Sequence, residues 1–502
     1  MSSHTESPER PARRTRRPLV LSALVLAMFL AAIEGTIVAT AMPSIAAKLG
    51  GFSLYGWVFS SYLLMQAVTT PIFGKLADLF GRKPVFIAGV LVFMLGSVLC
   101  GFAHSMTWLI AFRFLQGAGA GAVLPISSTL AADLYSLEER GRVQGYLASV
   151  WGISSILGPL AGGLIVQNAD WHWIFWLNVP FGIVSMLLIG LFLHERIEHH
   201  ERSIDFAGAG LLLVGLTALM LALTQGGEWG AGAAGALAGA SLVCLFLFVR
   251  HERRAPDPLM HLEMWSIRVI RLGNAAILAL GVAMIGLISF LPTFVQGVLG
   301  RSALVAGFTL SGMTLGWPIA SVVAGRLFVR LGVRRLVRAG ALAALAGALV
   351  IALTASRGVV PTALGAFVMG LGFGLLNTTY IVAIQSSVPW RQRAVATASN
   401  MLMRNIGNAM GAALLGGILN LRLERYLERT GLSGRVSLDS VRSLIGEGGP
   451  GGGALDPATL PLLREGLSAG LHLVLWSIVL FALATLAVSW RVPDLAPADP
   501  PA

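Results

Sequence analysis

The chain has 502 residues, of which 56% are hydrophobic and only 12% are charged. Soluble domains carry about 25% charged residues, so this composition excludes a soluble enzyme, a DNA-binding protein and a secreted scaffold. The net charge of +12 comes from basic residues that lie mostly between apolar segments, which indicates membrane topology rather than nucleic-acid binding. Cys100 and Cys244 each lie within an apolar segment, so we expect neither a disulfide framework nor a cysteine metal site.

Apolar segments long enough to cross about 30 Å of hydrocarbon recur along the whole chain. They predict an all-α integral membrane protein with fourteen transmembrane helices embedded in the lipid bilayer. The predicted spans are residues 19–42, 57–73, 85–102, 108–130, 143–166, 174–193, 206–223, 231–249, 272–295, 303–324, 336–353, 359–384, 394–419 and 469–490.

The distribution of basic residues predicts the orientation of these spans. If the N-terminal tail and every second connection are cytoplasmic, most arginines lie there, and the short outer loops hold only Lys48, Arg301 and Arg357. One misplaced span would invert every later loop and remove this asymmetry. We therefore predict a multi-pass membrane protein with both termini in the cytoplasm. A cleaved signal peptide fits less well, because the first apolar segment is too long and contains Glu34.

An internal repeat divides the chain. Residues 74–83 (GKLADLFGRK) join spans two and three, and a degraded copy at 325–335 (GRLFVRLGVRR) joins spans ten and eleven. Both loops are predicted on the same side, as in transporters built of two like bundles. We expect a cytoplasmic basic tail, an N-terminal six-helix bundle, two inserted helices with cytoplasmic linkers, a C-terminal six-helix bundle that includes an outer loop at 420–468, and a cytoplasmic tail. Their predicted ranges are 1–18, 19–193, 194–271, 272–490 and 491–502.

Four motifs resemble those of the major facilitator superfamily. Segment 74–83 is similar to the signature between its second and third spans, and 109–117 (LIAFRFLQG) resembles the fourth-span motif. Segment 158–163 (GPLAGG) resembles the antiporter motif of the family's span five. Segment 171–182 (WHWIFWLNVPFG) resembles the start of the family's span six. Together with fourteen spans, they resemble the drug:proton antiporters. The resemblance extends over 33–490 and implies the major facilitator fold, two six-helix bundles plus two inserted helices.

Three ionisable residues lie deep within predicted spans: Glu34, Arg113 and Arg404. A charge at the bilayer centre costs at least ~2.5 to 3.5 kcal/mol, so each is a functional candidate. Glu34 is a buried carboxyl group of the kind a proton carrier needs, although the family usually has aspartate here. Arg113 shares a helical face with Gln116 and is placed to pair with Glu34, so substrate and proton would compete; the resemblance implies a role in proton transfer. Permanent ion pairing is the alternative for both.

Arg404 has no buried acid left to pair with after Glu34. Backbone carbonyls, Asn377 or an anionic group of the substrate are its candidate partners, and a structural role is the alternative.

Segment 74–83 predicts a cytoplasmic gate. Its glycines permit a tight turn between spans, and Asp78 is an acceptor suited to an arginine or a helix N-terminus. The resemblance implies that this aspartate latches the two bundles together and that Asp133 is a second acceptor in a cluster with Arg82. The predicted gate residues are Gly74, Asp78, Gly81, Arg82 and Asp133.

Small residues follow one face of span five, where the spacing permits close helix packing. Serine stands at the first position, where the family usually has glycine. The resemblance implies a role in preventing leak, and ordinary packing explains the pattern equally well. The residues are Ser154, Gly158, Pro159, Gly162 and Gly163.

Aromatic and amide residues in the spans expected to line the central cavity suit flat apolar or cationic compounds. They are Trp57, Tyr62, Gln66, Trp151, Phe290, Trp317, Asn377 and Tyr380, with Arg404 as a further candidate.

No catalytic triad, phosphate loop or metal-ligand spacing is present at a usable position, so we expect neither an enzyme nor a cofactor or metal site. Uphill transport would then draw on an ion gradient, and the resemblance implies protons as the ion and the bacterial inner membrane as the location. The sequence predicts a monomeric proton-coupled efflux antiporter that exports small hydrophobic or cationic compounds, with neutral and monocationic compounds preferred over dications. Whether a periplasmic adaptor subunit is needed is left open. The alternatives are a dedicated exporter of one endogenous metabolite or antibiotic, and a membrane sensor that transports nothing.

Overall fold

The computed structural model describes residues 15–50, 54–195, 205–256, 258, 260, 262–430 and 460–494, and its secondary structure is helical throughout these ranges. Parts of the predicted tails, of the linker at 194–271 and of the outer loop at 420–468 therefore lie outside the described residues. The helices are α1 (Arg17–Leu49), α2 (Tyr55–Phe80), α3 (Arg82–Gly101), α4 (Met106–Leu134), α5 (Leu137–Asn168), α6 (His172–Trp176), α7 (Asn178–Phe192), α8 (Phe206–Trp229), α9 (Ala231–Glu252), α10 (Arg268–Gly297), α11 (Ala303–Thr354), α12 (Val359–Ser386), α13 (Arg393–Arg429) and α15 (Leu460–Trp490). Short 3-10 turns precede α10, α12 and α13 at Leu262–Ser266, Ala355–Arg357 and Trp390–Gln392.

Each of the fourteen predicted spans is helical, although only 12 helices of the described chain are long and apolar enough to count as membrane spans. The two differences have physical causes. Helix α11 contains two predicted spans, which meet at Gly332, where a φ of 72° interrupts the helical geometry. Helix α2 carries too many polar residues to count by composition, among them Gln66, Thr69 and Thr70, and these three side chains are buried.

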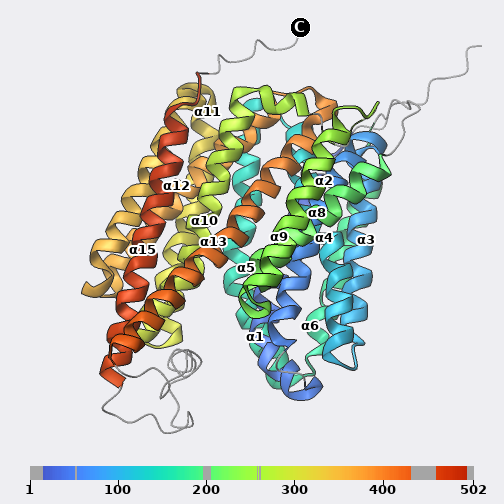
Figure 1. The fold of residues 1–502 in the computed structure, drawn as a ribbon. Coiled ribbons are helices and arrows are strands. Elements are labelled where there is room, and N and C mark those ends of the chain that lie inside the picture. The colour runs from blue at the N-terminus through green and yellow to red at the C-terminus, as the bar shows by residue number, and fades with distance from the viewer. Residues whose placement is uncertain are drawn as a thin grey trace, which may run out of the picture.

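The helices form two packed groups (Figure 1). Helices α1 to α7 pack on one another, as do α10 to α15. Helix α8 pairs with α9 and also contacts α2 and α13, so the inserted pair lies over the line between the two groups.

At the start of α8, the Asp205 carboxylate accepts hydrogen bonds from the Gly208 amide (2.8 Å) and from His251 Nε2 of α9 (2.9 Å). Burial opposes ionisation of this carboxyl group. The hydrogen bonds from Gly208, His251 and the Ala207 amide, together with the Coulomb interaction with His251, outweigh it and lower the pKa of Asp205.

The two groups meet closely at one end of the molecule, where α2 packs on α13 and α5 packs on α11. Glycine allows both contacts. A β-carbon on Gly74 would lie 2.7 Å from the Ala398 β-carbon, and one on Gly141 would lie 1.8 Å from the Gly325 α-carbon. We call this the closed end. Gly74 and Gly325 are the first residues of the two copies of the repeated segment.

The structure corrects the predicted role of Gly74. Helix α2 continues past the predicted boundary at residue 73 to Phe80, so Gly74 lies inside a helix and serves close packing. The turn between spans two and three is the single residue Gly81, whose φ is 92°. A residue with a β-carbon is strained at that φ, so the sharp turn requires the second glycine of the segment.

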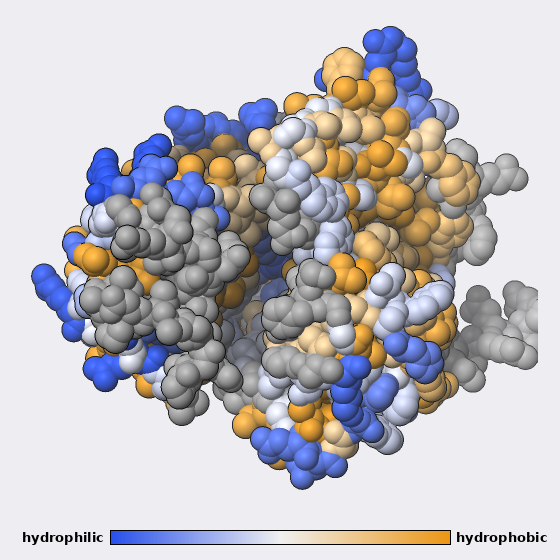
Figure 2. All heavy atoms as spheres, turned by 60° about the horizontal axis from the view of Figure 1, so that its bottom comes forward, coloured by the Kyte–Doolittle hydropathy of each residue, from blue (hydrophilic) through white to orange (hydrophobic). Residues whose placement is uncertain are grey.

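At the other end, which we call the open end, the molecule is hollowed between the two groups of helices (Figure 2). Many large apolar side chains are exposed on the sides of the protein, including Leu164, Leu191 and Leu480, each about 60% exposed or more. So many exposed apolar side chains are what a lipid-facing surface requires.

Candidate functional site

Glu34 lies on α1 with a fully buried side chain. Its Oε1 accepts a hydrogen bond from Arg113 Nη1 of α4 at 2.5 Å, and its Oε2 accepts one from Asn178 Nδ2 of α7 at 2.7 Å. Both carboxylate oxygens are therefore satisfied without water. The structure brings together Glu34 and Arg113, the pair expected from the sequence, and adds Asn178 as a partner that was not predicted.

Arg113 is held on several sides. Its Nε donates to the Val58 carbonyl at 3.1 Å, and its Nη1 donates to Gln116 Oε1 at 2.8 Å. The ring of Tyr62 lies against the guanidinium, with 4.3 Å between the Arg113 Cζ and the ring centroid. Tyr62 is 3% exposed, so its expected role in contacting substrate is replaced here by a cation–π contact with Arg113.

Ser97 on α3 connects these groups. Its Oγ accepts hydrogen bonds from Asn178 Nδ2 (2.8 Å) and Gln116 Nε2 (3.1 Å), and donates to the Phe175 carbonyl (2.8 Å). Glycines let the helices approach: a β-carbon on Gly96 would lie 2.5 Å from the Gln116 amide nitrogen. The result is an enclosed polar cluster in which one carboxylate balances one guanidinium.

This cluster is suited to a proton-dependent switch. In the ionised form, Glu34 and Arg113 neutralise each other in a site that excludes water. Protonation of Glu34 would leave the Arg113 charge buried without a counter-ion, a state that costs several kcal/mol and favours rearrangement.

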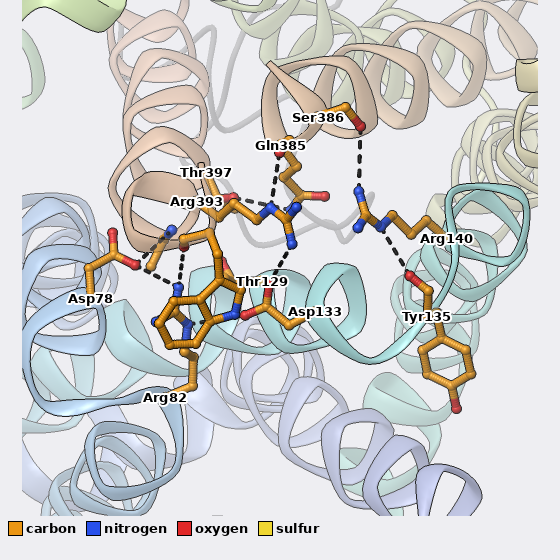
Figure 3. A network of polar contacts seen from close by, with 12 residues as sticks. Asp78, Arg82, Thr129, Asp133, Tyr135, Arg140, Gln385, Ser386, Arg393 and Thr397 are labelled. Atoms are coloured by element: carbon orange, nitrogen blue, oxygen red, sulfur yellow. Dashed lines mark hydrogen bonds and ion pairs between the residues drawn. The ribbon is translucent and has the colours of Figure 1, made fainter. Parts of the chain in front are cut away.

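A second cluster holds the closed end together (Figure 3). Asp78 of α2 reaches the first turn of α13, where Oδ1 accepts from the Ala394 amide (3.3 Å) and Oδ2 from the Val395 amide (3.0 Å). Gln392, the residue before α13, provides no side-chain cap. The carboxylate from the other group of helices therefore caps α13, where the helix dipole favours a negative charge.

Arg82 lies at the centre of this cluster and is fully buried. Its Nη2 donates to Asp78 Oδ1 at 2.8 Å, and its Nε lies 3.1 Å from Asp133 Oδ2. The same guanidinium reaches across to Trp390, donating to its carbonyl at 2.6 Å and stacking on its ring at 3.6 Å from the centroid. Because only a guanidinium combines a planar stacking face with several donors, lysine would not replace it.

Further contacts across the closed end surround this centre. Arg393 Nη1 of α13 donates to Asp133 Oδ1 of α4 at 2.9 Å. Gln385 Nε2 of α12 lies 3.3 Å from the Ser128 carbonyl of α4. The predicted gate residues Asp78, Arg82 and Asp133 are thus brought together, with Arg393, Trp390 and Gln385 as partners that the sequence did not single out.

The small residues of α5 pack against α1 next to Glu34. A β-carbon on Gly158 would lie 1.9 Å from Thr36 Oγ1, and one on Gly162 would lie 3.0 Å from the Ile37 carbonyl. Ser154 is buried, and its carbonyl accepts a hydrogen bond from Thr36 Oγ1 at 3.1 Å. Gly163 has no atom within 4 Å of such a β-carbon, so it takes no part in this packing. The side chain of Pro159 lies outside the described residues.

The residues predicted to line a cavity differ in their burial and contacts. Tyr380 is fully buried and shares a hydrogen bond with Ser489 of α15 (2.8 Å), so it lines no cavity in this structure. Trp57 stacks on Trp229 of the inserted pair at 5.7 Å. Gln66 is buried on α2, and Trp151 is 45% exposed on α5. Phe290 packs against the apolar core. Trp317 lies edge-on to Phe373, with its ring nitrogen buried and without a hydrogen-bond partner.

Arg404 of α13 donates to Asn377 Oδ1 of α12 at 3.4 Å, which confirms one of the partners expected for it. It forms no ion pair within the part of the chain that the structure describes. Among the described residues, no group of three histidine, cysteine, aspartate or glutamate side chains is placed to hold a metal ion.

The model of the Major Facilitator Superfamily matches residues 24–412. The chain belongs to the major facilitator superfamily. It is 35% identical over 416 residues to the multidrug transporter protein MdtP of Bacillus subtilis (strain 168), an alignment that covers 82% of this chain and 76% of that protein. It is also 35% identical over 411 residues to multidrug resistance protein 3 of the same organism, covering 81% of this chain and 80% of the relative. Both relatives are named for multidrug transport or resistance.

The fold agrees with solved structures of the superfamily. The crystal structure of the human organic anion transporter MFSD10 (TETRAN) superposes with a TM-score of 0.65 over 96% of this chain and 100% of that chain. The proton:xylose symporter XylE superposes with a TM-score of 0.60 over 95% of this chain and 96% of that chain. Both are 15% identical to this chain, so these likenesses concern the fold alone.

Within this major facilitator chain, sequence reasoning missed Asn178, a partner that carried a visible signal. It lies inside the quoted segment 171–182 and is a polar residue in an apolar span, which is a signal of an interior hydrogen bond. Gln116 was named only for the helical face that it shares with Arg113. Arg393 is one of the basic residues whose distribution indicates topology. Nothing in the local sequence distinguishes it from the other basic residues near the span ends.

Proposed function

We propose that this protein is a proton-coupled antiporter that exports small hydrophobic compounds across the bacterial inner membrane by alternating access. The protein is embedded in the lipid bilayer, and its two groups of helices move relative to each other during transport. The proposal includes the predicted orientation, with both termini and the closed end in the cytoplasm. The structure would then represent the state that is open to the outside.

The observation that carries the proposal is the enclosed Glu34–Arg113 pair. Glu34 is fully buried, and both its oxygens are bonded to α4 and α7. Taking up a proton there removes the charge that holds Arg113, so protonation and helix rearrangement are coupled. A protein that only bound a ligand would have no need for a buried carboxylate at this cost.

The closed end supplies the second element that alternating access requires. Asp78, Arg82 and Asp133 hold α13 through hydrogen bonds and ion pairs that separation of the helix groups would break. The energy for export is the proton gradient, worth about 1.4 kcal/mol per pH unit plus about 2.3 kcal/mol per 100 mV if charge moves. Relatives that are named for multidrug transport support a hydrophobic substrate class.

The test uses everted membrane vesicles with a pH-sensitive dye inside and an imposed proton gradient. Addition of lipophilic cations or neutral drugs is expected to release protons from vesicles with the wild type and not from those with Glu34→Gln. Glu34→Asp keeps the carboxyl group and is expected to retain part of the activity. Glu465→Gln, which removes an acid from the outer part of α15, is the matched control. Wild-type activity in Glu34→Gln would mean that Glu34 is not the proton carrier.

A further inference from the structure

Arg404 is the deep cation that the proposed mechanism does not use. It lies eleven residues after the start of α13 at Arg393, which is about 16 Å along the helix axis and near the middle of a bilayer about 30 Å thick. A guanidinium at this depth needs compensation for the loss of its hydration.

The protein provides little of that compensation. Arg404 donates one long hydrogen bond, to Asn377 Oδ1 at 3.4 Å, although a guanidinium carries five N–H donors. Arg113, by contrast, has a carboxylate, an amide oxygen, a backbone carbonyl and an aromatic ring. Within the described residues, Arg113 therefore has a carboxylate partner, whereas Arg404 has only an amide.

Among the described residues of the same half of the chain, no acid forms an ion pair with Arg404. From residue 268 to residue 423, the sequence contains no aspartate or glutamate. The first acid after this stretch, Glu424, lies on the same helix about 30 Å further along its axis. Glu34, the deep acid of the other half, is already bonded to Arg113 and Asn178.

Further polar atoms of this helix group are buried without a hydrogen-bond partner in the described part of the chain. Asn408 follows Arg404 by one helical turn, and its Oδ1 is buried without a hydrogen bond. The backbone carbonyl of Trp317 of α11 faces Gly374 of α12, and the Trp317 ring lies edge-on to Phe373, four residues before Asn377. Its buried Nε1 donor has no hydrogen-bond partner among the described residues. Helices α12 and α13 thus place a cation beside two amides, and α11 packs an indole ring against α12 about one helical turn from Asn377.

We propose that Arg404, with the Nδ2 groups of Asn377 and Asn408 as further donors, binds the anionic group of an amphipathic substrate, such as a carboxylate or sulfonate on an aromatic body. This inference rests on the proposed export function and extends its substrates to lipophilic acids. The aromatic ring of Trp317 suits the apolar body, and the guanidinium supplies the charge that the protein leaves unpaired. Where the cytoplasm is electrically negative, the membrane potential itself favours the exit of such an anion.

Two probes that differ by one sulfonate group test the proposal: 8-anilinonaphthalene-1-sulfonate and the neutral N-phenyl-1-naphthylamine. Binding to the full chain in lipid nanodiscs is measured by energy transfer from tryptophan, which reports probe bound close to the protein. Arg404→Gln is expected to weaken sulfonate binding tenfold or more and to leave binding of the neutral probe unchanged, which also shows that the variant is folded. Arg404→Lys is expected to weaken sulfonate binding less than Arg404→Gln does. Substitution of an exposed arginine, Arg357→Gln, is expected to leave sulfonate binding unchanged.

Equal binding of the sulfonate by the wild type and Arg404→Gln would overturn the anion site, and so would an equal loss of both probes. Displacement of the sulfonate by inorganic sulfate at constant ionic strength would overturn the amphipathic substrate class. The vesicle experiment on Glu34 is independent of these outcomes. A wild type that binds the sulfonate through Arg404 but releases no protons would retain the anion site and refute the proposed antiport.

Discussion

The backbones of Gly141 and Gly325 touch across the two groups of helices, so that a β-carbon on Gly141 would lie 1.8 Å from the Gly325 α-carbon. Gly74 packs in a similar way on α13, where a β-carbon on Gly74 would lie 2.7 Å from the Ala398 β-carbon. Because Gly74 and Gly325 begin the two copies of the repeated segment, each copy contributes its first glycine to the closed end. Close packing of backbones is therefore part of how this end shuts.

Substitution of Gly325 is expected to keep the closed end from shutting. In Gly325→Val the new side chain would overlap the α5 backbone, which cannot move aside as a flexible side chain would. With Ser128→Cys as a reporter and Cys100 and Cys244 replaced by alanine, labelling by a polar maleimide should accelerate about tenfold, equivalent to about 1.4 kcal/mol. Gly307→Val is the control, since a β-carbon there meets no atom within 4 Å. Equal labelling rates in the two variants would contradict this role of Gly325.

Asp78 is expected to hold the closed end through the first turn of α13. In Asp78→Asn the charge that pairs with Arg82 and caps the Ala394 and Val395 amides is lost, at a cost of about 2 kcal/mol. The same Ser128→Cys reporter should become several-fold more reactive. Asp494→Asn is the control, because that exposed carboxylate only approaches Arg334 at 3.9 Å. The prediction fails if both variants label at the wild-type rate.

Glu34 and Arg113 are expected to be strongly coupled in stability. Either Glu34→Leu or Arg113→Met leaves a buried charge without its partner, which should lower the free energy of unfolding by about 3–5 kcal/mol. The double variant removes both charges and should lose much less than the sum of the two single losses. Denaturant unfolding of the purified protein measures all four forms. Additive losses would show that the two side chains do not depend on each other.

The small-residue face of α5 is expected to matter at Gly158 and not at Gly163. A β-carbon on Gly158 would lie 1.9 Å from Thr36 Oγ1, two residues from Glu34, whereas one on Gly163 meets no atom within 4 Å. Gly158→Val should therefore lower stability by about 1–3 kcal/mol, seen as a lower melting temperature in detergent. Gly163→Val should melt close to the wild type. A similar loss in both variants would mean that the whole motif, rather than one packed face, carries the effect.

The sequence alone determined the features that depend on composition and local pattern. Apolar length identified all fourteen helical segments, and the high cost of a charge in hydrocarbon singled out Glu34, Arg113 and Arg404. The motifs pointed to the major facilitator fold and to Asp78, Arg82 and Asp133 as one cluster. The helical segments could be predicted because each depends on residues within one span, whereas the cluster with Asp133 joins three helices and was expected only from the resemblance.

Only the tertiary structure decided which side chains meet. Asn178 lies 144 residues from Glu34, and the Asp78 contact with Val395 joins residues 317 apart. Such pairs depend on how each helix is rotated and shifted against its neighbours, and that is set by packing along the whole interface. The same reason explains why Tyr380 turned into the core and why Gly74 serves a contact rather than a turn. A sequence pattern indicates that a buried polar residue needs a hydrogen-bond partner, whereas helix packing determines which residue is that partner.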